Sequence, residues 1–161
     1  MNAKRSEWDK IRDLYHKLLY WLYRRGNVQK ALKYADQLEP LLDKADPNHG
    51  AILAEEIWSL ISEAKGDLRN AIRHRENEIG AIRQLHTISR DQPYEKIATN
   101  GYDYSDLSDR LNLLAALYHD SGNLDGAIRT LSKSKQLCAD HGIEFDADDV
   151  LEEYLAEKAS S

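Results

Sequence analysis

The 161-residue sequence contains one cysteine and no long apolar run. Cys138 has no second thiol with which to form an internal disulfide or a thiolate metal site, so we interpret it as a small buried hydrophobe. No apolar stretch approaches the roughly 20 residues that span a bilayer, so no membrane association is expected. The first residues, "MNAKRSEWDKIRD", are not followed by the apolar core of a secretion signal. The expected location is therefore cytoplasmic.

The sequence also lacks an excess of positive charge. Its net charge of −6 argues against non-specific nucleic-acid binding, because phosphates would be repelled. The charge is unevenly distributed: residues 1–30 carry eight basic and three acidic side chains, and residues 139–161 carry one and eight. These ends are either solvated helix faces or surfaces complementary to a partner or to a second copy of the chain.

Catalytic and metal-binding motifs are missing as well. The six histidines are scattered, and the sequence has no His-Glu-x-x-His pair, no phosphate-binding glycine loop and no nucleophile elbow. We therefore expect a protein that is not an enzyme, with no metal and no cofactor.

What the sequence does contain is apolar residues at steps of three and four, the period of amphipathic helices. Such stripes predict three helical hairpins, at about 7–43, 47–86 and 105–141, and a capping helix at 146–158 within a single domain, 1–161. Arg75 and Gly80 interrupt the stripe of the fourth helix. The predicted helix starts are residues that can cap free N–H groups: Ser6, Asn27, Asp46, Asp67, Ser105, Asn123 and Asp146.

Between the second and third hairpins the periodicity disappears. Residues 87–104, "TISRDQPYEKIATNGYDY", contain a proline and an Asn-Gly turn dipeptide and predict a long loop. Loops of this length are commonly functional or disordered, and both alternatives stay open from the sequence.

One short pattern occurs three times: "GNVQKAL", "GDLRNAI" and "GNLDGAI", which begin at Gly26, Gly66 and Gly122. Glycine can adopt the left-handed conformation that ends a helix, and the following Asn or Asp can cap the next one. The alanine in each copy, with its small side chain, lets two helix backbones approach closely. Each copy therefore predicts a tight helical hairpin.

These hairpins resemble tetratricopeptide repeats over about residues 11–142. The resemblance implies an all-α, right-handed superhelical array of three helical hairpins plus a C-terminal capping helix. The repeats are degenerate and elongated, because Gly26 and Gly66 are 40 residues apart and Gly66 and Gly122 are 56 apart.

The resemblance also implies a concave face that binds a peptide or a partner protein. Its groove-facing positions are, in repeat order, Asp13, His16, Tyr20, Tyr23 and Arg24; Leu53, Glu56, Ile57 and Leu60; and Asp109, Asn112, Leu113, Ala116 and His119. Tyr20 and Tyr23 are the expected anchor, since tyrosine offers a large rigid contact area, although the rings could instead pack against the next repeat.

The expected function is a non-catalytic protein-protein interaction module. A self-associating scaffold or regulatory subunit, and a peptide or small-molecule sensor, remain alternatives. Members of the family that hold acidic chaperone tails use Lys, Asn and Arg at five groove positions. Those positions are here His16, Tyr20, Ile57, Asp109 and Leu113, none of which suits that ligand.

Overall fold

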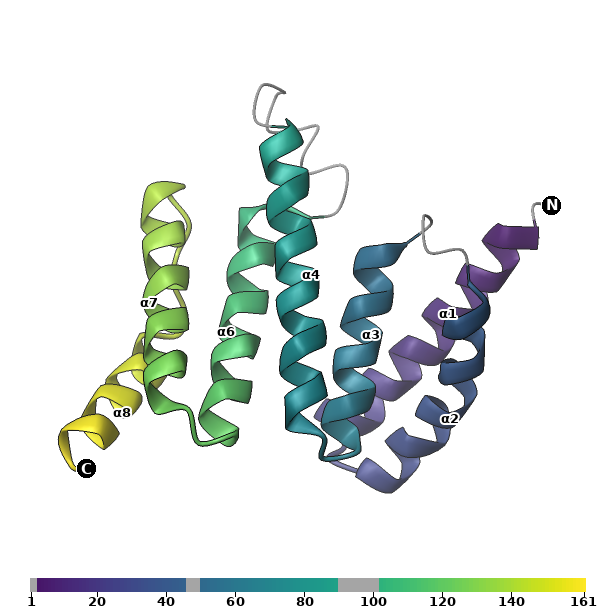
Figure 1. Ribbon diagram of the computed structural model, residues 1–161, viewed down its shortest axis with the longest axis horizontal. Coiled ribbons are helices and arrows are strands. Elements are labelled where there is room, and N and C mark those ends of the chain that lie inside the picture. Colours follow the sequence, from purple (N-terminus) through teal and green to yellow (C-terminus); the bar gives the residue numbers. More distant parts are fainter. Residues whose placement is uncertain (1–2, 46–49, 90–101) are drawn as a thin grey trace. The chain divides into compact units, whose positions relative to one another are not determined.

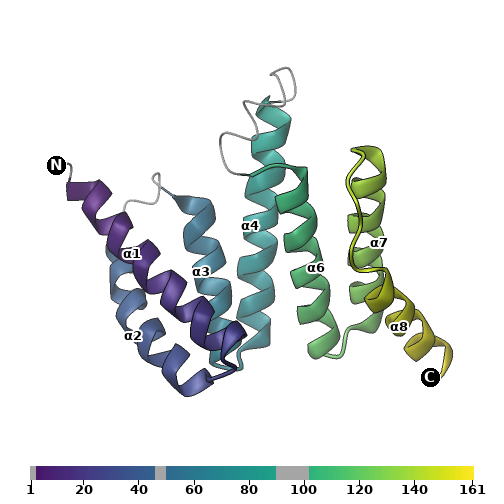
Figure 2. The same ribbon diagram turned by 180° about the vertical axis from the view of Figure 1, so that it is seen from behind.

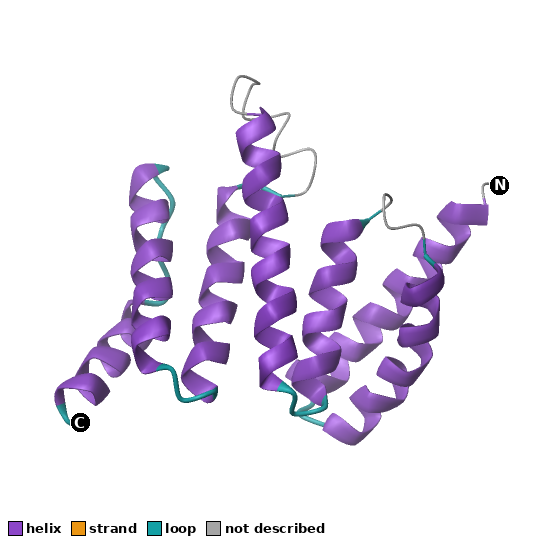
Figure 3. Ribbon diagram, viewed as in Figure 1, coloured by secondary structure: helices purple, strands orange, loops and turns teal. Residues whose placement is uncertain are grey.

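The computed structural model describes residues 3–45, 50–89 and 102–161, and these ranges contain helices but no strand (Figure 3). The helices, labelled in Figure 1, are α1 (Ala3–Leu19), α2 (Val28–Lys44), α3 (Ala51–Ala64), α4 (Leu68–Ser89), α6 (Tyr104–Asp120), α7 (Leu124–Asp140) and α8 (Asp148–Ala159). A π-helical turn, η1 (Tyr20–Arg24), continues α1. The prediction of an all-α fold is confirmed. Within the described ranges, no helix combines the length and the apolar character needed to cross a membrane.

The chain divides into two compact units, Met1–His74 and Arg75–Ser161, which we call unit 1 and unit 2. The boundary falls inside α4, so the first turns of this helix belong to unit 1 and the remainder to unit 2.

Unit 1 begins with the predicted hairpin of α1 and α2. Gly26 has a φ of 59°, and the Asn27 side chain accepts a hydrogen bond from the backbone N–H of Lys30 at 3.0 Å. Ala31 and Ala35 are fully buried, so α2 lies close against α1. The glycine, the cap and the small residues act here as the sequence predicts.

The turn between α3 and α4 follows the same rules. Gly66 has a φ of 77°, and the Asp67 side chain accepts from the backbone N–H of Asn70 at 3.2 Å. The buried Ser59 hydroxyl donates to the carbonyl oxygen of Ala71 at 2.7 Å. Two small residues therefore bring the helices close enough for a direct side-chain to backbone bond.

Unit 2 contains the third hairpin, in which α6 and α7 run side by side (Figures 1 and 2). Gly122 has a φ of 86°, and Asn123 accepts from the backbone N–H of Gly126 at 2.9 Å. The core of this hairpin includes Ala127, which is fully buried, and it extends to Leu151 and Tyr154 of α8. As predicted, α8 packs against the last hairpin.

A buried charge cluster explains why Arg75 interrupts the apolar stripe of α4. Arg75 Nη1 lies 2.7 Å from Glu78 Oε1, and Arg110 Nε lies 3.0 Å from Glu78 Oε2. The side chains of Arg75 and Glu78 are 1% and 0% exposed. Glu78 therefore joins two cations from α4 and α6 inside unit 2.

Several predicted boundaries are wrong. Helix α1 begins at Ala3, so Ser6 lies within it. Asp103, not Ser105, caps α6: it forms a capping box with Asp106, with N–H to carboxylate bonds of 2.8 and 3.0 Å, and these reciprocal bonds fix the start. Asp146 precedes Ala147, the residue before α8.

The predicted loop also begins too early. Residues 87–89 still belong to α4, which continues to Ser89. The predicted start at Asp46 and most of the loop lie outside the described residues.

Candidate partner-binding surface

The groove positions predicted for the first repeat form one exposed stripe along α1 and η1. We call it the tyrosine surface, and it consists of Asp13, His16, Tyr20, Tyr23 and Arg24. Tyr20 and Tyr23 are 43% and 48% exposed, so each presents part of its surface to solvent. The alternative that the rings pack against the next repeat is met in part by Tyr23, whose hydroxyl bonds to Glu63 of α3.

The π-helical turn orients these rings. The N–H of Arg25 donates to the carbonyl of Tyr20 at 3.0 Å, and the N–H of Asn27 donates to the carbonyl of Trp21 at 2.7 Å. The turn leaves Tyr20 in solvent while Trp21 packs against the core of unit 1. The two rings meet edge to face, with centroids 5.1 Å apart.

The two tyrosines differ in how firmly they are held. The Tyr23 hydroxyl donates to a carboxylate oxygen of Glu63 at 2.5 Å, which ties it to α3. The Tyr20 ring is held by its contact with Trp21. One ring is therefore fixed by a charge-assisted hydrogen bond and the other by an aromatic neighbour.

Cations and aromatic rings also meet beside this surface. A hollow of about 220 Å³ in unit 1 is lined by Trp21, Lys30, Lys33, Tyr34 and Gln37. Lys30 Nζ lies 4.1 Å from the centre of the Trp21 ring, within the range of a cation–π contact. An ammonium group and an indole ring therefore lie together next to the tyrosine surface.

The prediction for the second repeat is partly wrong. Leu53 and Glu56 are half-buried, but Ile57 and Leu60 are 0% and 1% exposed and belong to the core of unit 1. The physical reason is that α3, "AILAEEIWSLISEA", is apolar on more than one face, and such a helix is buried on more than one face.

On α6, three of the predicted positions, Asp109, Leu113 and Ala116, are exposed, and Asn112 is half-buried. Burial and the carboxylate of Asp146 raise the pKa of Asp109.

The fifth position of this repeat, His119, is covered by the terminal helix. Its Nε2 atom lies 2.7 Å from a carboxylate oxygen of Glu157, and its ring stacks on Tyr154 with centroids 4.5 Å apart. Helix α8 therefore occupies the surface that His119 was expected to offer to a partner.

Reactive groups do not gather around these residues. Within the described ranges, no group of three His, Cys, Asp or Glu side chains is placed to hold a metal ion. Cys138 is buried, as expected, with its sulfur 3.1 Å from the Ser108 hydroxyl.

Sequence reasoning missed the π-helical turn and the buried partner of Arg75. A pattern of apolar residues carries no signal for an extra residue within one helical turn, nor for the contact between Glu78 and Arg110, which lie 32 positions apart.

Comparisons of the chain with protein families, with curated proteins and with solved structures found no match.

Proposed function

We propose that this chain is a non-catalytic interaction module that binds a peptide or a partner protein through the tyrosine surface. The observation that carries the proposal is the exposure of Tyr20 and Tyr23 on a π-helical turn. Tyrosine is enriched among the residues that dominate binding energy, and π-helical turns within α-helices are frequent at functional sites.

The neighbouring charges support a partner with acidic groups. Arg24 and Arg25 are exposed next to the tyrosines, and Lys30 lies over Trp21. Two exposed rings flanked by cations provide apolar contact area, hydrogen-bonding tips and electrostatic attraction in one place.

We further propose that the helical hairpins stack into a right-handed superhelix of the tetratricopeptide type, with the tyrosine surface on its concave side. The repeated glycine, cap and alanine pattern supports this arrangement, because each hairpin leaves an apolar face that a neighbour could cover. Small-angle X-ray scattering should then give a curved, elongated particle. A scattering profile of a compact sphere would contradict the superhelix.

The binding proposal can be tested by site-specific photocrosslinking in the native host. A photoreactive phenylalanine at Tyr20 is expected to capture a partner, whereas the same residue at Val150, an exposed position in unit 2, is not. Replacing Tyr23 by alanine should weaken the Tyr20 crosslink while circular dichroism stays unchanged. Equal capture from both positions would argue against a site at the tyrosine surface.

A second copy of the chain is the alternative occupant, and the opposite charges of residues 1–30 and 139–161 favour it. Light scattering at low and high salt distinguishes the two. A charge-driven oligomer should dissociate as salt rises, because the Debye length falls to about 3 Å at 1 M salt.

A further inference from the structure

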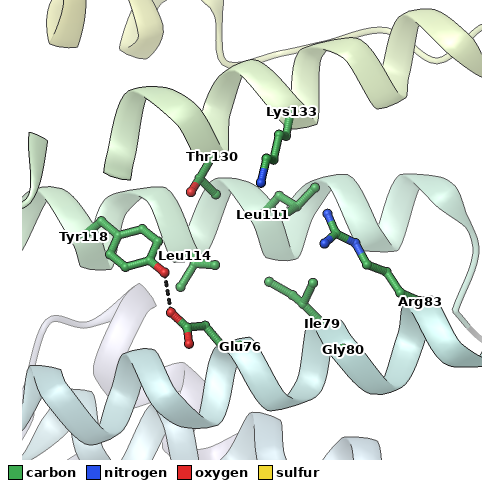
Figure 4. A pocket seen from close by; sticks show the side chains of 9 residues that line it. All are labelled: Glu76, Ile79, Gly80, Arg83, Leu111, Leu114, Tyr118, Thr130 and Lys133. Atoms are coloured by element: carbon green, nitrogen blue, oxygen red, sulfur yellow. Dashed lines mark hydrogen bonds between the residues drawn. The ribbon is translucent and has the colours of Figure 1, made fainter. Parts of the chain in front are cut away.

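Unit 2 contains a groove that the function proposed above does not use. A hollow of about 230 Å³ lies between α4, α6 and α7 (Figure 4), and its floor includes Ile79, Leu111 and Leu114. A second hollow, of about 250 Å³, shares Arg83, Leu111 and Lys133 with the first. The two hollows therefore form one groove, which we call the α4–α7 groove.

Two cations face this groove from opposite walls. Arg83 comes from α4 and Lys133 from α7, and both side chains point toward the space over Leu111 (Figure 4). Neither cation has an ion-pair partner within the part of the chain that the structure describes. The middle of the groove therefore holds two cations without a direct ion-pair partner in the described residues, above an aliphatic floor.

The two acidic residues that line the groove, Glu76 and Asp140, have hydrogen-bond partners of their own. Glu76 accepts a hydrogen bond from the Tyr118 hydroxyl (Figure 4), and Asp140 accepts one from Gln136 Nε2 at 2.8 Å. These bonds leave both carboxylates charged but hold them on other partners, and neither acid forms an ion pair with Arg83 or Lys133.

Gly80 gives a further indication that the groove is used. It is an exposed glycine in the interior of α4, where glycine costs roughly 0.5–1 kcal/mol relative to alanine. Its backbone does not require glycine, since its φ is not positive, and a Cβ there would meet no atom within 4 Å. The missing side chain therefore serves no packing purpose within unit 2, but it leaves room for another backbone in the groove.

We propose that the α4–α7 groove binds an acidic peptide segment of a partner protein. A carboxylate of that segment lies between Arg83 and Lys133, and a neighbouring apolar side chain contacts Ile79 and Leu111. Gly80 lets the peptide backbone approach α4. This site is independent of the tyrosine surface, because all of its residues belong to unit 2.

The surroundings favour a peptide over a nucleic acid. The floor is aliphatic, and the aromatic ring in the lining, Tyr118, bonds to the carboxylate of Glu76, whose negative charge would repel the phosphates of a base stacked there. The chain as a whole carries a net charge of −6, which opposes binding of a polyphosphate more strongly than binding of a segment with one carboxylate. A single carboxylate beside an aliphatic side chain matches both the charge and the lining of the groove.

The test uses the full-length, isotope-labelled chain and amide NMR spectra. The probe is an acetylated and amidated peptide with one glutamate between two leucines, and its counterpart carries glutamine instead. We expect the glutamate peptide to shift the amides of residues 76–83, 111–118 and 130–137 and to bind about 10-fold more tightly than the glutamine peptide. Equal affinity for the two peptides would overturn the proposal.

Two sets of variants test the charge and the shape of the groove separately. Replacing Arg83 and Lys133 by glutamine should weaken binding of the glutamate peptide about 10-fold, whereas Arg69→Gln with Lys44→Gln, which removes two exposed cations of unit 1, should not. Gly80→Leu should abolish binding by filling the groove without lowering stability, whereas Gly80→Ala should retain it. Retained binding in Gly80→Leu contradicts the proposed position of the peptide.

Other occupants would give distinct results, each of which overturns the proposal. Equal competition by inorganic phosphate would indicate a phosphate site. Concentration-dependent shifts of the same amides without peptide, together with a dimer mass in light scattering, would indicate a second copy. Peptide-induced shifts confined to residues 13–25 would support the tyrosine surface and refute the groove. Conversely, the Tyr20→Ala, Tyr23→Ala variant should bind the peptide in the groove normally.

Discussion

Replacing Glu78 by glutamine is expected to destabilise unit 2 by about 2–3 kcal/mol. In the native chain this carboxylate accepts bonds from Arg75 at 2.7 Å and from Arg110 at 3.0 Å. The change keeps the size of the side chain and removes its charge. The two guanidinium groups then face each other without the anion that lies between them.

The magnitude follows from burial. The side chains of Arg75, Glu78 and Arg110 are 1%, 0% and 14% exposed, so water solvates these charges poorly. Removing one partner of a fully buried pair costs about 3–5 kcal/mol. Glutamine retains one acceptor oxygen and Arg110 keeps some contact with water, so we expect the lower end of that range or slightly less.

Two optical probes can report on the two units separately. All three tryptophans, Trp8, Trp21 and Trp58, lie in unit 1, whereas far-ultraviolet circular dichroism reports on helices of both units. In urea unfolding, Glu78→Gln should lower the circular dichroism midpoint of unit 2 by about 1–2 M. Glu152→Gln, an exposed change on α8, serves as the control and should leave the midpoint unchanged.

The tryptophan signal shows how the units are coupled. If they unfold independently, the fluorescence transition keeps its midpoint, and if they unfold together, both signals shift by the same amount. If the free energy of unfolding obtained from each signal falls by less than about 0.5 kcal/mol, the argument is refuted, because an ordinary surface substitution has an effect of that size. A variant in which Arg75, Glu78 and Arg110 are all replaced by apolar residues should regain part of the stability, since it removes all three charges of this cluster.

Three further predictions concern unit 2. Gly126→Ala should lower stability by about 1 kcal/mol, although alanine favours helices, because its Cβ would lie 2.6 Å from the Asn123 side chain and displace that cap; urea unfolding measures the loss. Ala127→Leu should destabilise by about 1–3 kcal/mol in the same assay, since Ala127 is fully buried and a larger side chain must separate α6 from α7. Burial, with a hydrogen bond to Glu76, raises the pKa of Tyr118 to about 12, so its contribution to stability is present below pH 10.0 and lost as the pH rises toward 12. Glu76→Gln should lower this pKa without restoring 10.0, because burial is its largest cause, and carbon NMR of the Tyr118 ring can follow the titration.

The turns of the fold could be predicted because their causes are local. Gly26, Gly66 and Gly122 each adopt a positive φ, and the Asn or Asp that follows each glycine caps the next helix. These interactions join residues at most four positions apart, so a short stretch of sequence contains all the participants.

The rest depends on tertiary contacts. Arg75 disrupts an apolar stripe, and only the fold reveals that Glu78 and Arg110 accompany it inside unit 2. Ile57 and Leu60 occupy positions that the repeat pattern assigns to a groove, yet both are buried in the core of unit 1. In each case the tertiary environment, which no helical period encodes, decides whether the side chain is exposed.

The two proposed sites lie where the sequence departs from the needs of its own fold. The three glycines that begin the repeated pattern have positive φ values, which favour glycine. Gly80, by contrast, lies inside the regular helix α4, where alanine would be more stable. Tyr20 and Tyr23 expose large rings on a π-helical turn, although the rest of α1 turns its apolar side chains inward. Because local preferences otherwise agree with the structure, a position that gives up stability without a packing reason is the place to look for binding. By this argument, a large side chain at Gly80 or the loss of the ring at Tyr20 should weaken binding, whereas changes at the buried alanines should affect binding only through stability.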